Sequence, residues 1–497
     1  MCVVTALAAL SMVETSIVAS LTSVPSPDGR ELLALSHSCE WLEVRADLVG
    51  DPEPNWIRGF FAGKLIYSLR SRDAGGEFEG SDFDRASRLL AASLNYDLVE
   101  LDAKRDLRPE VTSGIAADKR LVSWHGRPAS YDELAAGFDL LSSIPAKLYK
   151  LVVAGGCGAD ALWALSLLKS LKRSDVIAFA SGESGLWSRL VAPHLGAPII
   201  FGSAEPSWTS DGDPSVHQLI QDYGLPNLSP VHEIYGIVGN PVRHSLSPRM
   251  HNAAYRALGC PAVFVPFQVE SFGDFWRDLV SSGQLESLGF SIRGLTVASP
   301  HKETALREAR VRSPMSRRVG AANVFVRQNG HWKADTTDPE GVALANGKPG
   351  FSMMGINAAV VGCGGAGRAI AAALDQAGAV VTLVNRGTER GDMASKLLQL
   401  PFVPLSSFRV DKFSVVVNAT PVGRNDNRMP FEIEGLKQEA AVIDLVYGKE
   451  PTPLVAKTRG AGRLVIDGRD VLEAQVRRQF HMMTGREMPL ELVREQL

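Results

Sequence analysis

The chain has little cysteine, little net charge and no long apolar run. Its 497 residues include five scattered cysteines, which argues against a fold held by a disulfide framework and favours a reducing compartment, the cytoplasm. A net charge of −3 gives no support for a nucleic-acid partner. No cysteine–histidine cluster has the spacing of metal ligands, so we expect no metal.

A membrane partner is not expected either. The stretch Met1–Met12 is apolar, but it is too short to span a bilayer and lacks the basic residues of a signal peptide. We interpret it as a leader or as a cap on the first domain. No other stretch is long and apolar enough for a membrane span.

Short apolar runs alternate with helix-like segments throughout the first half. Hydrophobic residues make up 45% of the chain and charged residues 22%, which is typical of a globular protein, and the length predicts more than one domain. Eight runs separated by helix-like segments predict an α/β fold, a closed parallel (β/α)8 barrel. The runs are 17–21, 41–45, 64–69, 98–101, 120–123, 148–154, 176–180 and 198–202.

Lys150 is the one charged residue in the apolar run 148–154. A strand of a parallel sheet is buried on both faces, and burial lowers the pKa of an ammonium group. A neutral amine in an apolar pocket can attack a ketone and form a Schiff base. The alternative is an edge-strand lysine whose head reaches water.

Other polar residues fall at the carboxyl ends of these runs, where barrels of this kind build their active sites. His125 follows the fifth run, and its ordinary pKa near neutrality suits it to remove a proton beside an imine. Arg70 or Arg189 could hold a substrate carboxylate through a bidentate fork. The alternative for His125 is a histidine of the core.

The first half resembles the type I 3-dehydroquinate dehydratases. The motifs that carry the resemblance are Glu43-Val44-Arg45-Ala46-Asp47, Leu69-Arg70-Ser71, Ser123-Trp124-His125, Lys150 and Ser188-Arg189-Leu190. The resemblance implies that Lys150 forms the Schiff base and that His125 is the acid–base group. It also implies a set of substrate-binding residues, namely Glu43, Arg45, Arg70 and Arg189.

Two positions depart from that family. An acid that orients the histidine often precedes the family's double glycine after its strand-three arginine, and here Ala74 has this position. The family's substrate-covering Ser-Ala-Pro-Gly-Gln loop is poorly matched by residues 209–213. The sequence therefore does not identify the acid that orients His125 or the residues that cover the substrate.

A dinucleotide-binding pattern occurs in the second half, which begins after linker residues near Pro230. An apolar strand over 358–361 runs into the glycine-rich turn 362–367, and a helix is predicted over 369–377. The glycines let a backbone approach a pyrophosphate at the helix N-terminus. The next strand, 380–384, is followed by Asn385-Arg386. Arginine rather than an acid there favours NADP over NAD.

From about Ile234 onward the chain resembles the shikimate dehydrogenases. The signature is Gly239-Asn240-Pro241, His244-Ser245-Leu246-Ser247-Pro248 and His251-Asn252. The resemblance implies that Ser245 and Ser247 bind the substrate carboxylate, although Ser247 followed by proline also suits a helix N-cap.

The same resemblance implies roles for residues farther along the chain. Lys302 and Asp338 form the catalytic pair, and the substrate is bound by Asn323, Gln475 and Tyr447. Tyr447 also lies near the nicotinamide in that family, and the alternative for this residue is a role in packing. Together with the glycine turn, the resemblance implies a set of NADP-binding residues, namely Gly362, Gly364, Gly365, Ala366, Gly367, Asn385, Arg386, Arg390, Asn418 and Thr420.

The order of the two halves matches that of bifunctional enzymes that join the two activities. The implied domains are a barrel over 1–229, a substrate-binding domain over 230–345 completed by 470–497, and an NADP-binding Rossmann domain over 346–469. Two alternatives remain open. Ala298 and Thr336 replace residues usual in the dehydrogenases, which leaves a quinate-type specificity open, and the same folds could serve a non-catalytic metabolite sensor.

Overall fold

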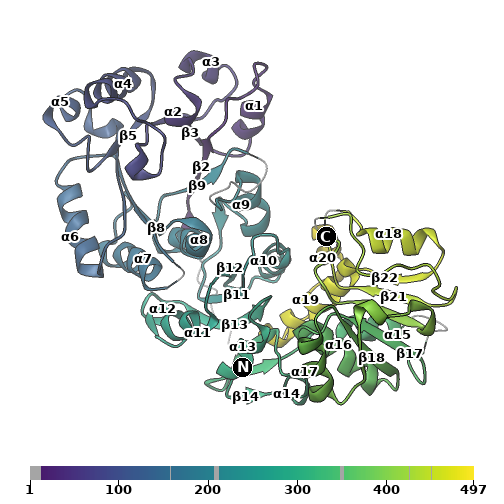
Figure 1. The fold of residues 1–497 in the computed structure, drawn as a ribbon. Coiled ribbons are helices and arrows are strands. Elements are labelled where there is room, and N and C mark those ends of the chain that lie inside the picture. Colours follow the sequence, from purple (N-terminus) through teal and green to yellow (C-terminus); the bar gives the residue numbers. More distant parts are fainter. Residues whose placement is uncertain (1–12, 157, 206–211, 348–351, 425, 449) are drawn as a thin grey trace, which may run out of the picture. The chain divides into compact units, whose positions relative to one another are not determined.

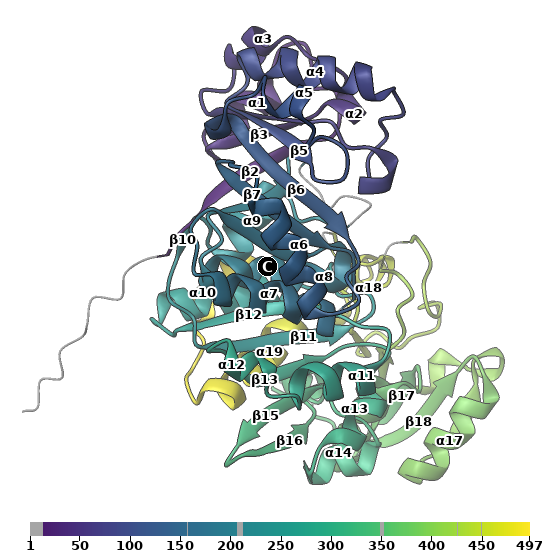
Figure 2. The same cartoon turned by 90° about the vertical axis from the view of Figure 1, so that its left-hand side faces the viewer.

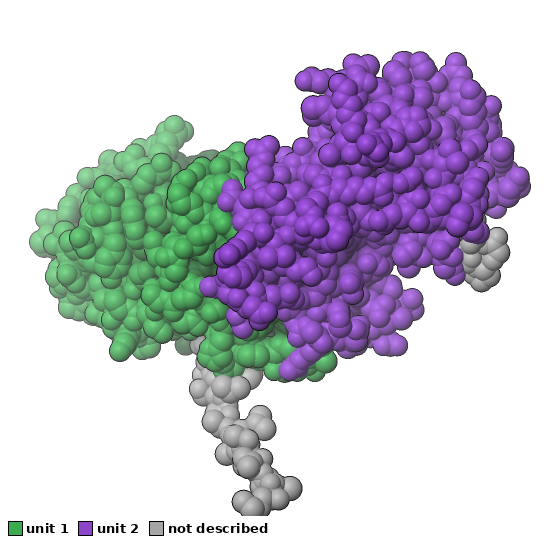
Figure 3. Space-filling view, turned by 90° about the horizontal axis from the view of Figure 1, so that it is seen from below, with its two compact units in different colours: residues 1–236, 241–292 green, residues 237–240, 293–497 purple. Residues whose placement is uncertain are grey.

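A computed structural model describes residues 13–156, 158–205, 212–347, 352–424, 426–448 and 450–497. Met1–Met12, which we interpret as a leader or a cap, lie outside these ranges, and so do residues 209–211 of the stretch that poorly matches the family's covering loop. The chain divides into two compact units, which consist of residues 1–236 with 241–292 and of residues 237–240 with 293–497 (Figure 3).

Eight parallel strands form the first sheet, in the order β8-β7-β6-β5-β4-β3-β2-β9. All eight predicted strands are present and confirm the predicted barrel. The strands are β2 (Ser16–Leu21), β3 (Trp41–Arg45), β4 (Lys64–Ser68), β5 (Leu98–Asp102), β6 (Arg120–Gly126), β7 (Leu148–Val153), β8 (Val176–Ala180) and β9 (Ile199–Ser203).

Among the described residues, backbone hydrogen bonds do not close the barrel. Within the described ranges, the strand ladder ends at β8 on one side and at β9 on the other. Arg189, in the helix after β8, donates a hydrogen bond to the carbonyl of Phe201 in β9 (3.4 Å). The sequence predicted a closed barrel, in which β8 and β9 would pair. In the structure, the Arg189 side chain links the β8 region to β9 instead.

Helices lie outside the strands of this sheet, as α4, α5 and α6 show in both views (Figures 1 and 2). The longest, α4, begins with a capping box in which Ser81 and Asp84 satisfy each other's backbone N–H groups. The helices of this region are α1 (Arg30–Ser36), α2 (Ala46–Val49), α3 (Pro54–Arg58), α4 (Asp82–Asn95), α5 (Pro109–Thr112), α6 (Tyr131–Ser142), α7 (Ala159–Leu171), α8 (Gly182–Val191) and α9 (Val216–Tyr223). The short strands β1 (Val13–Glu14) and β10 (Asn227–Leu228) pair separately.

The interior of the barrel is apolar except near the carboxyl ends of its strands. Leu148 and Val152 of β7 belong to a buried cluster with Phe179 and Phe201. Side chains two residues apart point to the same face of a strand, so Lys150 points into the interior between these two residues. The alternation of side chains along β7 therefore places the Lys150 amine inside an apolar barrel.

The second sheet is mixed, with the order β12-β11-β13-β15-β16-β14. Its strands are β11 (Glu233–Gly239), β12 (Ala262–Gln268), β13 (Ser291–Val297), β14 (Val311–Arg312), β15 (Val324–Gln328) and β16 (His331–Asp335). The helices of the same region are α10 (Ser247–Ala257), α11 (Phe272–Phe275), α12 (Gln284–Ser287), α13 (Lys302–Glu308), α14 (Pro314–Val319), α15 (Glu340–Asn346), α19 (Gly468–Thr484) and α20 (Leu490–Gln496).

The third sheet is parallel, with the order β19-β18-β17-β20-β21-β22. Its strands are β17 (Asn357–Val361), β18 (Val380–Asn385), β19 (Phe402–Pro404), β20 (Val415–Asn418), β21 (Ala441–Asp444) and β22 (Leu464–Ile466), and its helices are α16 (Gly365–Gln376), α17 (Thr388–Leu398) and α18 (Pro453–Gly460). The predicted β–turn–α–β pattern is present. However, α16 begins at Gly365 rather than at the predicted 369, because the last glycines of the turn already have helical backbone.

No helix in the described part of the chain is long and apolar enough to cross a membrane. The described residues also contain no group of three or more His, Cys, Asp or Glu side chains placed to hold a metal ion.

Candidate active sites

Lys150 is buried in the barrel, with 1% of its surface exposed. Its Nζ lies 2.5 Å from Oε1 of Glu100 and 3.9 Å from Oε1 of Glu43, and 4.6 Å from the centre of the Phe201 ring. Because β7 lies between β6 and β8, the edge-strand alternative is wrong. Burial lowers the pKa of Lys150, although Glu100 opposes this effect. The geometry therefore provides an amine that loses its proton more easily than a free lysine.

His125 lies at the carboxyl end of β6, next to the same carboxylate. Its Nε2 is 3.6 Å from Oε1 of Glu100 and has no hydrogen-bond partner among the described residues. Burial lowers the pKa of His125 to about 4, although Glu100 opposes this shift. The imidazole is therefore neutral at physiological pH and able to accept a proton.

Glu100 connects the two candidate catalytic groups, although we gave it no role from the sequence. It receives a hydrogen bond from Ser68, and Arg70 Nε lies 3.8 Å from its Oε2. Burial opposes ionisation of Glu100, but the cations of Lys150 and Arg70 hold its pKa well below the usual range. Its position at the carboxyl end of a barrel strand was the signal that could have identified it.

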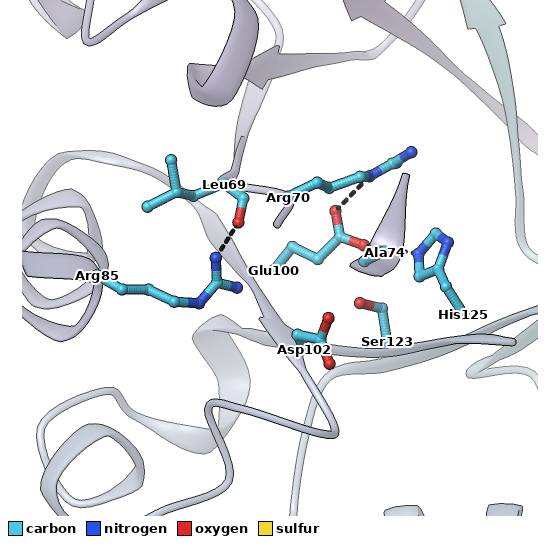
Figure 4. A pocket seen from close by; sticks show the side chains of 8 residues that line it. All are labelled: Leu69, Arg70, Ala74, Arg85, Glu100, Asp102, Ser123 and His125. Atoms are coloured by element: carbon cyan, nitrogen blue, oxygen red, sulfur yellow. Dashed lines mark hydrogen bonds and ion pairs between the residues drawn. The ribbon is translucent and has the colours of Figure 1, made fainter. Parts of the chain in front are cut away.

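A pocket at this end of the barrel is lined by Glu100, His125 and Ala74, among others (Figure 4). Figure 4 shows the Glu100 carboxylate lying between the side chains of Arg70 and His125. Ala74 brings no carboxylate to this pocket. Glu100 is therefore the acidic group that faces His125 in the described structure.

The three predicted substrate-binding arginines of the barrel are each paired with a carboxylate. Nη2 of Arg70 donates to Glu43 (3.0 Å), and Arg45 donates to both oxygens of Asp47 (2.9 and 2.7 Å). Arg189 forms an ion pair with Asp213 (2.7 Å). Glu43, Arg70 and Lys150 share one site, whereas the guanidinium of Arg45 is used by Asp47.

Neutralising Glu100 should change the pH dependence of this site. Glu100 raises the pKa of Lys150 and of His125, so Glu100→Gln lowers both values and each base form is present at lower pH. We expect the ascending limb of dehydration kcat/KM against pH to move to lower pH. Asp102→Asn is the matched control, because Asp102 lines the same pocket without contacting Lys150. A limb that stays in place or moves to higher pH contradicts this role.

A second set of polar residues meets at Asp338 in the other unit. Lys302 Nζ donates to both carboxylate oxygens of Asp338 (3.0 and 2.9 Å). Asn323 Nδ2 and Gln475 Nε2 donate to its Oδ1 at 3.0 and 3.1 Å. The structure therefore brings all four predicted residues together.

Asn323 and the turn that carries Asp338 are fixed by further hydrogen bonds. Asn323 Oδ1 accepts the backbone N–H of Thr337 (2.8 Å), and Gln479 of α19 donates to the Thr337 hydroxyl (2.9 Å). Thr337 and Gln479 were not predicted as site residues. Gln479 lies one helical turn from Gln475, which is the signal that could have identified it.

Ser245 and Ser247 lie in the other compact unit, at and just before the start of α10. Ser247 is the first residue of this helix rather than its N-cap, which is Leu246 and makes no side-chain capping bond. The N-cap alternative is therefore wrong. Pro248 has the predicted early position, and the Ser245 hydroxyl accepts the Ser247 N–H (3.2 Å).

The glycine turn after β17 is shaped for close approach of a backbone to a ligand. Gly362 has a φ of 109°, and a Cβ atom there would overlap Ala419. A Cβ atom at Gly367 would overlap the carbonyl of Gly362, and one at Gly365 would lie 3.2 Å from the Lys302 Cβ. The turn thus fits a pyrophosphate at the N-terminus of α16 and lies beside the Lys302 side chain.

The remaining predicted cofactor residues surround the ends of β18 and β20. Asn385 Oδ1 accepts the N–H of Cys363 (3.2 Å), and Asn418 Oδ1 accepts the N–H of Thr420 (3.0 Å). Arg386 is exposed, and Arg390 donates to Glu303 (2.8 Å). Gly364 caps α16, Ala366 lies in its first turn, and Tyr447 follows β21.

Comparisons with known proteins separate the chain into the same two halves. Residues 24–229 match the type I 3-dehydroquinase family, and residues 237–325 match the shikimate dehydrogenase substrate binding domain. The chloroplastic bifunctional 3-dehydroquinate dehydratase/shikimate dehydrogenase of Arabidopsis thaliana is 26% identical over 456 residues, which cover 86% of this chain and 74% of that protein.

One further relative and one solved structure are also similar to this chain. The shikimate dehydrogenase (NADP(+)) of Syntrophobacter fumaroxidans is 34% identical over 264 residues, which cover 52% of this chain and 89% of that protein. The solved structure of the dehydroquinate dehydratase and shikimate dehydrogenase from S. pombe AroM is 21% identical with a TM-score of 0.43, and the match covers 97% of this chain and 98% of that one. This chain therefore belongs to the shikimate dehydrogenase family through its second half and carries a type I 3-dehydroquinase domain as its first half.

Proposed function

We propose that this chain catalyses two consecutive reactions of the shikimate pathway. The first half dehydrates 3-dehydroquinate to 3-dehydroshikimate, and the second half reduces that product to shikimate with NADPH. The observation that carries the proposal is the presence of two lysine–carboxylate sites in one chain, one around the buried Lys150 and one around Lys302 and Asp338. A non-catalytic sensor would not need either lysine.

In the dehydratase half, neutral Lys150 attacks the substrate ketone, and loss of water gives a Schiff base. The imine accepts electrons, which acidifies the neighbouring C2–H bond, and His125 takes that proton. His125 then returns the proton to the C1 hydroxyl, which leaves as water, and hydrolysis of the imine releases 3-dehydroshikimate. Glu43, Arg70 and Arg189 hold the substrate through its polar groups.

In the dehydrogenase half, NADPH supplies the hydride that reduces the substrate carbonyl. The turn Gly362–Gly367 would hold its pyrophosphate, and Arg386 and Arg390 would hold its 2′-phosphate, with Asn385, Asn418 and Thr420 beside them. Lys302 donates the proton to the carbonyl oxygen. Asp338 orients Lys302, while Asn323, Gln475, Ser245 and Ser247 bind the substrate.

The protein is assayed with 3-dehydroquinate and NADPH by the loss of absorbance of the reduced nicotinamide. We expect NADPH consumption from 3-dehydroquinate alone, which requires both halves. Shikimate and NADP in the reverse direction report the second half alone, and quinate in place of shikimate measures its specificity. Absence of turnover in both directions would contradict the proposal.

We also propose the domain division given by the sequence, 1–229, 230–345 with 470–497, and 346–469. Cys39, Cys260 and Cys363 are free thiols, which supports a reducing compartment, and we propose the cytoplasm.

Arg386 should determine the preference for NADPH. Its exposed guanidinium follows β18, where it can pair with a 2′-phosphate. Loss of a hydrogen bond to a charged group costs about 1.5–3 kcal/mol, so we expect Arg386→Ala to raise the Kd for NADPH by about tenfold to 100-fold and to leave the Kd for NADH unchanged. Fluorescence titration of the reduced nucleotides measures both values. An equal loss of affinity for both nucleotides would show that Arg386 does not recognise the 2′-phosphate.

A further inference from the structure

Glu183 of the barrel binds two residues of the second half within one compact unit. It lies in the first turn of α8, directly after β8. Nη1 of Arg243 donates to its Oε1 (2.7 Å), and Nε2 of Gln268 donates to its Oε2. Both carboxylate oxygens are therefore used by side chains that lie outside the barrel.

These two partners control the loop that leads to Ser245 and Ser247. Arg243 is part of this loop, and Oε1 of Gln268 accepts the backbone N–H of Val242 (3.4 Å). The carbonyl of Val242 in turn accepts the N–H of Ser245 (3.0 Å), whose hydroxyl accepts the N–H of Ser247. A continuous set of hydrogen bonds thus runs from Glu183 to both serines.

The junction that holds Glu183 is packed. Trp187 of α8 is fully buried, and its ring lies 5.7 Å from that of Phe267 in β12. Helix α9 packs against α10, where Arg249 forms an ion pair with Asp222 (2.6 Å). Figures 1 and 2 show α8 and β12 close together. The Glu183 carboxylate therefore lies on a helix that is held in place by packing, not on a loosely packed surface helix.

We propose that Glu183 is a positioning residue for the dehydrogenase reaction, through which the barrel holds the loop 241–247 in its substrate-binding conformation. The inference rests on the proposed function, because that function assigns substrate binding to Ser245 and Ser247. A loop already held in its bound form avoids the cost of ordering when substrate arrives. The barrel then contributes to the dehydrogenase site as well as to the dehydratase site.

The experiment compares the full chain with its Glu183→Ala, Glu183→Gln and Arg243→Ala variants. The matched control is Asp175→Asn, which removes a similar barrel ion pair with Arg173 at the opposite end of β8. We expect Glu183→Ala to raise the KM for shikimate about tenfold, with kcat within about twofold. Glu183→Gln, which keeps one acceptor oxygen, should have a smaller effect.

A second measurement does not depend on turnover. Hydrogen exchange of the segment 241–247, followed by mass spectrometry, should be faster in Glu183→Ala and Arg243→Ala than in the wild type and in Asp175→Asn. Unchanged exchange overturns the proposal whether or not the protein oxidises shikimate. Faster exchange with an unchanged shikimate KM overturns the role in substrate binding. If the wild type itself does not oxidise shikimate, the proposed function fails, and the exchange result still decides whether Glu183 holds the loop.

An interaction cycle separates positioning from a general loss of structure. If Glu183 acts through Arg243, the double variant Glu183→Ala/Arg243→Ala should have a KM no higher than that of the more affected single variant. If the fold-increases in KM of the two single variants multiply in the double variant, the two residues act independently, and the role of Arg243 as the partner through which Glu183 acts is overturned. Dehydratase turnover on the same samples reports whether the barrel is still folded.

Discussion

We expect Lys150→Met to lower dehydratase kcat by about 10⁴-fold or more, because removal of a covalent nucleophile has effects of this size. The variant retains shikimate oxidation, since Lys302 and Asp338 belong to a separate set of contacts. The methionine leaves Glu100 and Glu43 buried without their ammonium partner, which destabilises the barrel. Lys150→Arg is therefore measured beside it, because a guanidinium keeps the positive charge and cannot form the imine. We expect equal loss of dehydratase activity in both variants.

Chemical trapping tests the same step directly. Borohydride added with 3-dehydroquinate should reduce the imine and attach the substrate to the peptide that contains Lys150. Lys104 is a useful comparison, because its Nζ donates to the carbonyl of His125 (3.1 Å) and so lies at the same end of the barrel. An adduct on Lys104, or none on Lys150, would remove the basis of the proposed mechanism.

The sequence predicted those site residues whose signal is local. Lys150 could be predicted because one charge in an apolar strand is conspicuous and period-two alternation places it inside the barrel. The glycine turn could be predicted because only glycine permits the close approach seen between Gly362 and Gly367. In both cases the residue and its structural cause lie within a few positions of each other.

Residues that depend on distant partners could not be derived in this way. Gln475 contacts Asp338 across 137 positions of the chain, and only the family resemblance indicated it. Glu100 stands near the end of a predicted strand, but its contact with Lys150 requires the relative placement of β5, β6 and β7. Glu183 likewise follows the seventh predicted strand, whereas its partners Arg243 and Gln268 lie in the other half of the sequence.

The start of α16, earlier than predicted, is a local example of a feature that sequence preference alone did not predict. Glycine has a low intrinsic preference for helix, so Gly365 and Gly367 were predicted as turn. In the structure they are the first residues of the helix, where missing side chains leave the backbone N–H groups accessible to an anion. A functional requirement has overridden the local preference at this position.

Asp338→Asn should lower shikimate dehydrogenase kcat by about 10²- to 10⁴-fold, the range expected for loss of a positioned acid–base group. Three donors, from Lys302, Asn323 and Gln475, converge on the Asp338 carboxylate. An amide in its place presents a donor of its own to this group, so Lys302 loses its orientation as well as its counter-charge. Lys302→Met removes the proton donor itself and should cause a similar loss.

The matched control is Asp375→Asn, which makes the same chemical change at a half-exposed ion pair with Arg318 in the same unit. We expect this variant to keep both activities, since such pairs contribute little to stability. Dehydratase turnover in Asp338→Asn should equal that of the wild type, because the charges around Lys150 come from Glu43, Arg70 and Glu100. A parallel loss of both activities would mean that Asp338 supports the fold rather than the reduction. A selective loss, together with unchanged NADPH affinity, places its effect in the proton-transfer step that Lys302 performs.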